Sequence, residues 1–173
     1  GGEPMMQGDF AFALASAAHK DGIHVAIDTS GFAPWAAFER MLPVVDLFLY
    51  DLKCMDAKRH RELTGVDNQA ILENIRRLDD AGAKTWIRSP LAPGLNDSDE
   101  DLDSLRDFVS RLRCMGKLEI CPYHPLGLEK YAKFGKKVLY DNPNPASRED
   151  VSRWKSALYG AACFSRQARM DIP

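Results

Sequence analysis

Short, largely apolar runs alternate along the chain with segments of helical periodicity, and this alternation constrains the fold more than any other feature. The runs cover residues 23–27, 44–49, 84–88 and 117–121. Each has the length of a buried strand and is followed by a loop of polar residues, glycine or proline. Strands that alternate with helices are typical of βα units around a parallel sheet. The sequence therefore predicts an α/β fold with four parallel strands and flanking helices.

The segments between these runs carry the spacing of amphipathic helices. Helices are predicted over 9–21, 34–41, 56–63, 68–81, 98–112 and 147–161, and the stretch 128–146 is predicted to be mostly irregular. Ser98 with Asp101, and Ser147 with Asp150, have the spacing of capping boxes. The first three long helices each place apolar side chains on one stripe. These stripes are Phe10, Ala13, Leu14, Ala17 and Ala18; Ile71, Leu72, Ile75 and Leu78; and Leu102, Leu105, Phe108, Val109 and Leu112.

The length of the chain limits how much of a barrel it can form. Its 173 residues suit a single domain over 1–173, whereas a complete (β/α)8 barrel needs roughly 250 residues. We therefore expect a partial, TIM-like (β/α) barrel that is open at one edge. The opening Gly1-Gly2-Glu3-Pro4 has the character of a loop that would follow a strand, so the expected open edge is a truncated one. An unpaired edge strand favours self-association, which predicts a possible dimer through this cut edge.

Composition excludes few functions, but it argues against nucleic acid and membrane as partners. The net charge is −2, 45% of residues are hydrophobic and 28% are charged, with no long basic block. There is no apolar run long enough to span a membrane and no signal peptide, so a cytoplasmic location is expected. The cysteines at 54, 114, 121 and 163 match no zinc or iron–sulfur spacing and are predicted to be reduced thiols on buried or half-buried side chains.

Polar residues follow each predicted strand at the end where α/β active sites are built. Asp28 and Thr29 end the first strand, Asp51 and Lys53 follow the second, Arg88 ends the third and His124 follows the fourth. Glu3 would end a strand that precedes the chain, and the two glycines before it would let a ligand approach the backbone. A carboxylate there can accept hydrogen bonds from a ligand ammonium group. These residues predict one rim that binds a ligand.

Each of these residues also has a purely structural explanation. Asp28 would simply cap a turn, Asp51 and Lys53 would form a surface ion pair of little energetic value, and Arg88 would join two loops. His124, between Tyr123 and Pro125, would be a hydrogen-bonded structural histidine. Their joint recurrence at strand ends favours the functional interpretation. His19, His24 and His60 do not share this placement and are taken as structural or surface residues.

An ordered set of motifs resembles the radical S-adenosylmethionine (SAM) activating proteins of glycyl-radical enzymes, the pyruvate formate-lyase activating enzyme family. The motifs cover residues 1 to about 160 and occur in the family's order. They are Gly1-Gly2-Glu3-Pro4, Ile27-Asp28-Thr29-Ser30-Gly31, Tyr50-Asp51-Leu52-Lys53 with His60 and Thr64-Gly65, Trp86-Ile87-Arg88, Pro93-Gly94-Leu95-Asn96-Asp97, and Pro122-Tyr123-His124-Pro125-Leu126-Gly127 with Lys130-Tyr131.

The resemblance implies a role for each rim residue. Gly1, Gly2 and Glu3 would meet the amino group of the SAM methionine moiety, and Lys53 and His124 its carboxylate or ribose side. Arg88 would shape the pocket. Asp28 would also bind the cofactor and, with Thr29 and Asp51, would hold a monovalent cation, for which hard oxygen ligands are suited.

The chain departs from this family at the iron–sulfur cluster. The family binds a [4Fe–4S] cluster through a Cys-x-x-x-Cys-x-x-Cys loop, and no such spacing occurs here, so no iron–sulfur ligand is identified. The resemblance implies that the full-length parent cleaves SAM reductively and installs a glycyl radical on a partner enzyme such as pyruvate formate-lyase, with flavodoxin or ferredoxin as electron donor. We expect this chain by itself to be inactive and to carry no catalytic residue.

Two other functions remain open on the sequence alone. One is a metal-dependent barrel hydrolase or lyase that uses Asp28, Asp51, Lys53 and His124. The other is a half-barrel that binds a nucleoside or a protein partner without catalysis.

Overall fold

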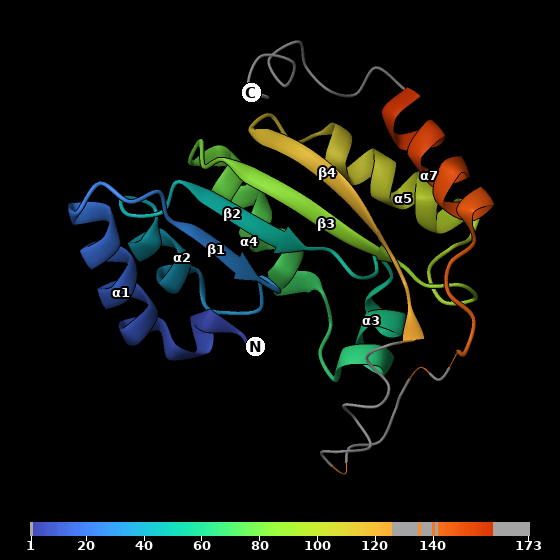
Figure 1. Cartoon of the computed structure of the whole chain (residues 1–173), viewed down its shortest axis with the longest axis horizontal. Helices are drawn as coiled ribbons and strands as arrows, with labels where there is room; N and C mark the ends of the chain where they lie inside the picture. The colour runs from blue at the N-terminus through green and yellow to red at the C-terminus, as the bar shows by residue number, and fades with distance from the viewer. Residues whose placement is uncertain (1, 126–134, 136–139, 141, 161–173) are drawn as a thin grey trace.

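The computed structural model describes residues 2–125, 135, 140 and 142–160, and these are the residues discussed below. Helices and strands alternate along the chain as the sequence predicts (Figure 1). In chain order they are η1 Pro4–Gln7, α1 Gly8–Lys20, β1 Ala26–Thr29, α2 Trp35–Met41, β2 Leu47–Asp51, α3 Ala57–Thr64, α4 Gln69–Asp80, β3 Thr85–Leu91, α5 Asp99–Ser110, β4 Met115–Pro122 and α7 Arg148–Gly160. Ser98 and Ser147 accept hydrogen bonds from the backbone N–H groups of Asp101 and Asp150, so both predicted caps are confirmed.

The strands form a single open sheet in the order β1-β2-β3-β4, with every neighbouring pair parallel. Their carboxyl ends therefore point the same way, as the arrowheads in Figure 1 show. The predicted α/β fold, a partial barrel whose sheet is not closed, is confirmed. β3 continues beyond its predicted end and includes Pro90, although proline cannot donate to a ladder. The last residue of β2, Asp51, pairs with Arg88, so no residue of β2 lies opposite Pro90. The missing N–H group of Pro90 is on this unpaired side of β3 and therefore interrupts no pairing between strands.

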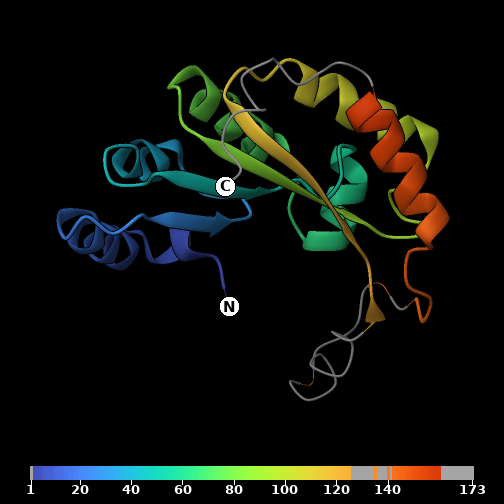
Figure 2. The same ribbon diagram turned by 45° about the horizontal axis from the view of Figure 1, so that its top comes forward.

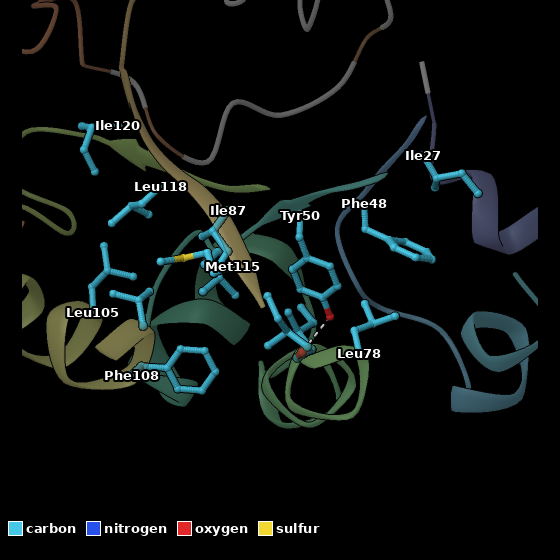
Figure 3. Packing of buried hydrophobic residues seen from close by; sticks show 14 of the residues in the cluster. Ile27, Phe48, Tyr50, Leu78, Ile87, Leu105, Phe108, Met115, Leu118 and Ile120 are labelled. Carbon is cyan, nitrogen blue, oxygen red and sulfur yellow. Dashed lines mark hydrogen bonds between the residues drawn. The ribbon is translucent and has the colours of Figure 1, made fainter. Parts of the chain in front are cut away.

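The core lies between one face of the sheet and the helices, chiefly α4 and α5, with further buried side chains from α2 and α7 (Figures 1 and 2). Burial alternates along β3, whose Ile87 faces this core, as do Phe48 and Tyr50 of β2. Figure 3 shows these side chains directed towards the helices, with the Tyr50 hydroxyl donating to the Ile71 carbonyl oxygen at 2.7 Å. The predicted stripes of α4 and α5 supply the other side of the core and are confirmed.

The stripe predicted for the first helix is not the buried one, so this part of the interpretation was wrong. Phe10 is 67% exposed and Leu14 60% exposed, whereas Ala15 is buried. Helix α1 is apolar on two sides, and its other side, which includes Phe12, packs against the core. Helical periodicity finds an apolar stripe but does not say which of two stripes meets the sheet.

Several sequence interpretations concern residues outside the described ranges. They are Gly1, Leu126-Gly127, Lys130-Tyr131, most of the irregular stretch 128–146, Ala161 and Cys163. In the described part of the chain, no helix has the length and apolar character needed to cross a membrane.

Candidate functional site

The carboxyl ends of β1, β2 and β3 bring three of the predicted rim residues together. Neighbouring residues of a strand point to opposite faces of a sheet, and Ile27, Tyr50 and Ile87 point into the core. Asp28, Asp51 and Arg88 therefore lie on the opposite, solvent-facing side. Asp51 is the direct register partner of Arg88, and Asp28 is one strand further away. The sheet thus places two carboxylates and a guanidinium side by side.

Arg88 bridges the two aspartates. Its Nε and Nη2 donate to Asp51 Oδ1 at 3.0 and 2.8 Å, and Nη2 also donates to Asp28 Oδ1. Burial lowers the pKa of Arg88, but its hydrogen bonds and charge interactions with Asp51 and Asp28 outweigh this effect and raise that pKa above the ordinary value. The guanidinium is therefore a permanent cation, fixed in orientation by two strands.

Lys53 adds a second, more accessible cation to this rim. Its ammonium lies 3.8 Å from Asp51 Oδ2, and its side chain is 43% exposed. Asp28, at the other end of the group, is 58% exposed. Among the described residues, Arg88 is bound to both aspartates, whereas the one ion pair of Lys53 is the long contact with Asp51. Lys53 is thus the more accessible cation of this group and Asp28 its more accessible carboxylate.

Glu3 is held by the loop that follows β1. Its Oε1 accepts from the Thr29 hydroxyl at 2.7 Å and from Met5 N–H at 3.1 Å. Its Oε2 accepts from Ser30 N–H at 2.7 Å and from the Ser30 hydroxyl at 2.5 Å. These bonds fix the start of η1 to the end of β1, on the side of Thr29 and not on the side that carries Asp28. The role of Ser30 was not predicted, because a serine in a turn gives no sign of a carboxylate 27 residues earlier in the chain.

Thr29 and Asp28 point to opposite faces of β1. The Thr29 side chain is 2% exposed and donates to Glu3, whereas Asp28 faces solvent and Arg88. A cation between the two aspartates would therefore reach Thr29 only through its backbone. In this structure the Arg88 guanidinium supplies the positive charge between Asp28 and Asp51.

No contact joins His124 or Gly2 to the Asp28–Asp51–Arg88 group among the described residues. His124 is exposed and follows the end of β4. The residue of β4 opposite Arg88 is Glu119, five residues before His124. Gly2 is exposed, and a Cβ at this position would meet nothing within 4 Å. The space around Gly2 is therefore open.

The described cysteines do not fit an iron–sulfur cluster. Cys54, Cys114 and Cys121 are free thiols, and no group of three or more His, Cys, Asp or Glu side chains that could hold a metal ion occurs among the described residues. The described residues thus give no support to the metal-dependent hydrolase alternative, since Arg88 lies between the two aspartates.

Cys121 provides a prediction that depends on pH. It lies on β4 opposite Pro90, and burial, followed by the charge of Glu119, raises the pKa of its thiol although Arg88 opposes this effect. Only the thiolate reacts with alkylating agents, so a raised pKa means slower alkylation at a given pH. We expect the pH midpoint for iodoacetamide labelling of Cys121, measured by peptide mass spectrometry, to lie higher in the native chain than in urea. A native midpoint at or below the unfolded one would contradict this.

Comparison with known proteins places these features in a family. Residues 1–106 match the radical SAM superfamily. The pyruvate formate-lyase 1-activating enzyme of Escherichia coli strain K12 is 34% identical over 160 residues, which cover 91% of this chain and 65% of that protein. The trans-4-hydroxy-L-proline dehydratase activating enzyme of Clostridioides difficile is 38% identical over 168 residues, covering 95% of this chain and 55% of that protein. The chain thus spans between about half and two thirds of the length of these two relatives.

A solved structure shows the same architecture. A domain of the pyruvate-formate lyase-activating enzyme from Bacteroides vulgatus superposes with a TM-score of 0.78 and 28% sequence identity, covering 92% of this chain and 90% of that one. The partial barrel is therefore shared with an activating-enzyme domain.

Proposed function

The chain belongs to the radical SAM superfamily, and on that premise we propose that it is the SAM-binding part of an activating enzyme for a glycyl-radical enzyme. The observation that carries this proposal is the rim, where an accessible cation and an accessible carboxylate flank a fixed guanidinium. SAM presents an aminocarboxylate of complementary charge. When bound, SAM would supply the adenosyl group that becomes the radical in this superfamily.

Each rim residue has a place in this proposal. Lys53 meets the SAM carboxylate, and Asp28 lies close enough to the same rim to meet its amino group. Arg88 fixes Asp28 and Asp51 so that neither carboxylate rotates away. Glu3 ties the start of η1 to the loop that follows β1, and in this proposal Glu3, Gly1 and Gly2 form the amino-group side. His124 would approach the ligand from the end of β4.

The partner and the location are more specific proposals. The similarity to pyruvate formate-lyase activating enzymes supports a pyruvate formate-lyase type of partner. Flavodoxin or ferredoxin as electron donor and a cytoplasmic location are further parts of this proposal. Other relatives are named as activating enzymes of an isethionate sulfite-lyase and of a trans-4-hydroxy-L-proline dehydratase. These two enzymes represent the alternative classes of partner.

The function is tested by electron paramagnetic resonance of the partner enzyme. The 173-residue chain, given SAM and a reductant without oxygen, should produce no glycyl radical, because its described residues offer no ligand set for the cluster. The same chain preceded by a segment with Cys-x-x-x-Cys-x-x-Cys should produce one. A glycyl radical with the 173-residue chain would refute the proposed inactivity, and the lack of one with the longer protein across all three partner classes would refute the activase function.

The exposed edge of the sheet predicts self-association of this chain. β1 ends the strand order, so one of its sides has no partner strand among the described residues. Beside it, Met6, Phe10 and Leu14 are 72%, 67% and 60% exposed and form an apolar stripe on η1 and α1. We expect light scattering to detect a dimer that Phe10→Asp converts to monomer. A monodisperse monomer of the unaltered chain at high concentration would contradict this.

A further inference from the structure

Asn96 joins the two loops that carry the rim cations. Its side-chain amide donates to the Lys53 carbonyl oxygen at 2.8 Å and to the Pro90 carbonyl oxygen at 2.6 Å. Its Oδ1 accepts from Ala92 N–H at 2.8 Å. Lys53 follows β2, whereas Pro90 lies two residues after Arg88 on β3. One side chain therefore ties the backbone of Lys53 to the strand of Arg88.

The amide of Asn96 is engaged by hydrogen bonds at both its nitrogen and its oxygen and has little contact with water. Asn96 is 4% exposed, and both donors and the acceptor are used by backbone groups of the neighbouring loops. Its own loop is also fixed, because Arg59 Nη1 donates to the Leu95 carbonyl oxygen at 2.7 Å and to Asp101 Oδ2 at 2.8 Å. A buried amide on a fixed loop holds its partners in one geometry, since losing a bond leaves a carbonyl without compensation.

The Lys53 side chain, in contrast, has little that would orient it. Its described ion pair with Asp51 is long, at 3.8 Å, and the side chain is 43% exposed. An exposed ion pair of this kind contributes little to holding a geometry. The place from which Lys53 reaches into the rim is therefore set by its backbone. Leu52 N–H bonds to the Arg88 carbonyl oxygen at 2.9 Å, and the Asn96 amide ties the Lys53 carbonyl to that of Pro90 on β3.

We propose that Asn96 is a positioning residue that sets the distance between Lys53 and Arg88, and thereby the site for a ligand carboxylate. This inference rests on the proposed function, because it treats the rim as the place where SAM binds. It goes beyond that function in assigning the spacing of two binding groups to a residue that lies behind the rim and does not touch the ligand.

The test compares two ligands that differ in the group Lys53 would meet. SAM carries the aminocarboxylate, and 5′-methylthioadenosine lacks it. In Asn96→Ala we expect calorimetry to show roughly tenfold weaker SAM binding, equivalent to about 1.4 kcal/mol, and 5′-methylthioadenosine binding unchanged within about twofold. Hydrogen exchange of backbone amides in 52–55 should become faster. Asn96→Ser restores one hydrogen-bond donor, so its SAM affinity and its exchange rate in 52–55 should lie between those of the unaltered chain and of Asn96→Ala. It replaces the alanine variant in the test if that variant does not fold.

Asn74 offers a matched control for the exchange measurement. It is also 4% exposed, and its amide also donates to two loop carbonyls, those of Gly31 at 2.9 Å and Ala33 at 2.8 Å. Asn74→Ala should accelerate exchange in 30–33 and leave 52–55 unchanged.

The outcomes separate this inference from the function on which it rests. Equal weakening of both ligands, or unchanged SAM affinity, would overturn the positioning role of Asn96. If the unaltered chain binds neither ligand, the proposed SAM site fails instead. Even then, hydrogen exchange tests whether Asn96 holds the backbone of Lys53. If exchange in 52–55 is the same in Asn96→Ala as in the unaltered chain, Asn96 does not fix that backbone.

Discussion

Replacement of Gly31 by alanine is expected to lower the free energy of unfolding by about 3 to 5 kcal/mol. Gly31 has φ of +79°, a left-handed conformation that strains any residue with a Cβ. A Cβ at this position would lie 1.9 Å from the hydroxyl oxygen and 2.2 Å from Cζ of Tyr50. Tyr50 is fully buried and bonded to the Ile71 carbonyl, so it has no room to move. The loss should appear as a lower urea midpoint with an unchanged slope.

Gly65 provides the control for backbone strain alone. It ends α3 with φ of +86°, but a Cβ there would meet nothing within 4 Å. Gly65→Ala should therefore cost only the conformational strain, about 1 to 2 kcal/mol. Equal losses for the two variants would show that the overlap with Tyr50 carries no weight, and would contradict the packing described for the turn after β1.

Replacement of Asp79 by alanine is expected to lower the free energy of unfolding by about 2 to 4 kcal/mol. Asp79 is 5% exposed on α4, and its Oδ1 accepts from the backbone N–H groups of Arg113 at 2.7 Å and Cys114 at 2.6 Å. Alanine would leave both donors without a partner just before β4 begins. Chemical denaturation monitored by circular dichroism measures this loss.

Asp80, the next residue of α4, is the matched control. Its side chain is 75% exposed and pairs only with the exposed side chain of Arg113 among the described contacts. Asp80→Ala should shift the denaturation midpoint much less than Asp79→Ala. If Asp79→Ala shifts the denaturation midpoint no more than Asp80→Ala does, the buried carboxylate does not have this structural role.

Local patterns were sufficient to predict the sheet and most of the core. Apolar runs identified all of the described strands, and the stripes of α4 and α5 follow from helical spacing. Because parallel strands end at the same edge, the sequence also predicted that Asp28, Asp51 and Arg88 would meet. The capping boxes at Ser98 and Ser147 could also be predicted, because each serine and its partner lie within one helical turn of the sequence.

Features that depend on contacts distant in the sequence were not predicted. The buried side of α1 depends on which neighbour it meets, and its two apolar stripes are equivalent in the sequence. Asn96 stands in an ordinary turn-forming segment, so nothing local indicates that its amide reaches Lys53, 43 residues earlier. The binding of Glu3 by Ser30 is hidden in the same way.

Binding of SAM at the carboxyl edge of the sheet can be measured by hydrogen-exchange mass spectrometry with and without SAM. Bound SAM should slow exchange in 28–31, 51–54 and 88–92, the segments that carry Asp28, Lys53 and Arg88. Protection confined to the opposite side of the sheet, for example to the groove lined by Arg76, Glu100 and Arg111 on and beside α4 and α5, would show that SAM binds elsewhere.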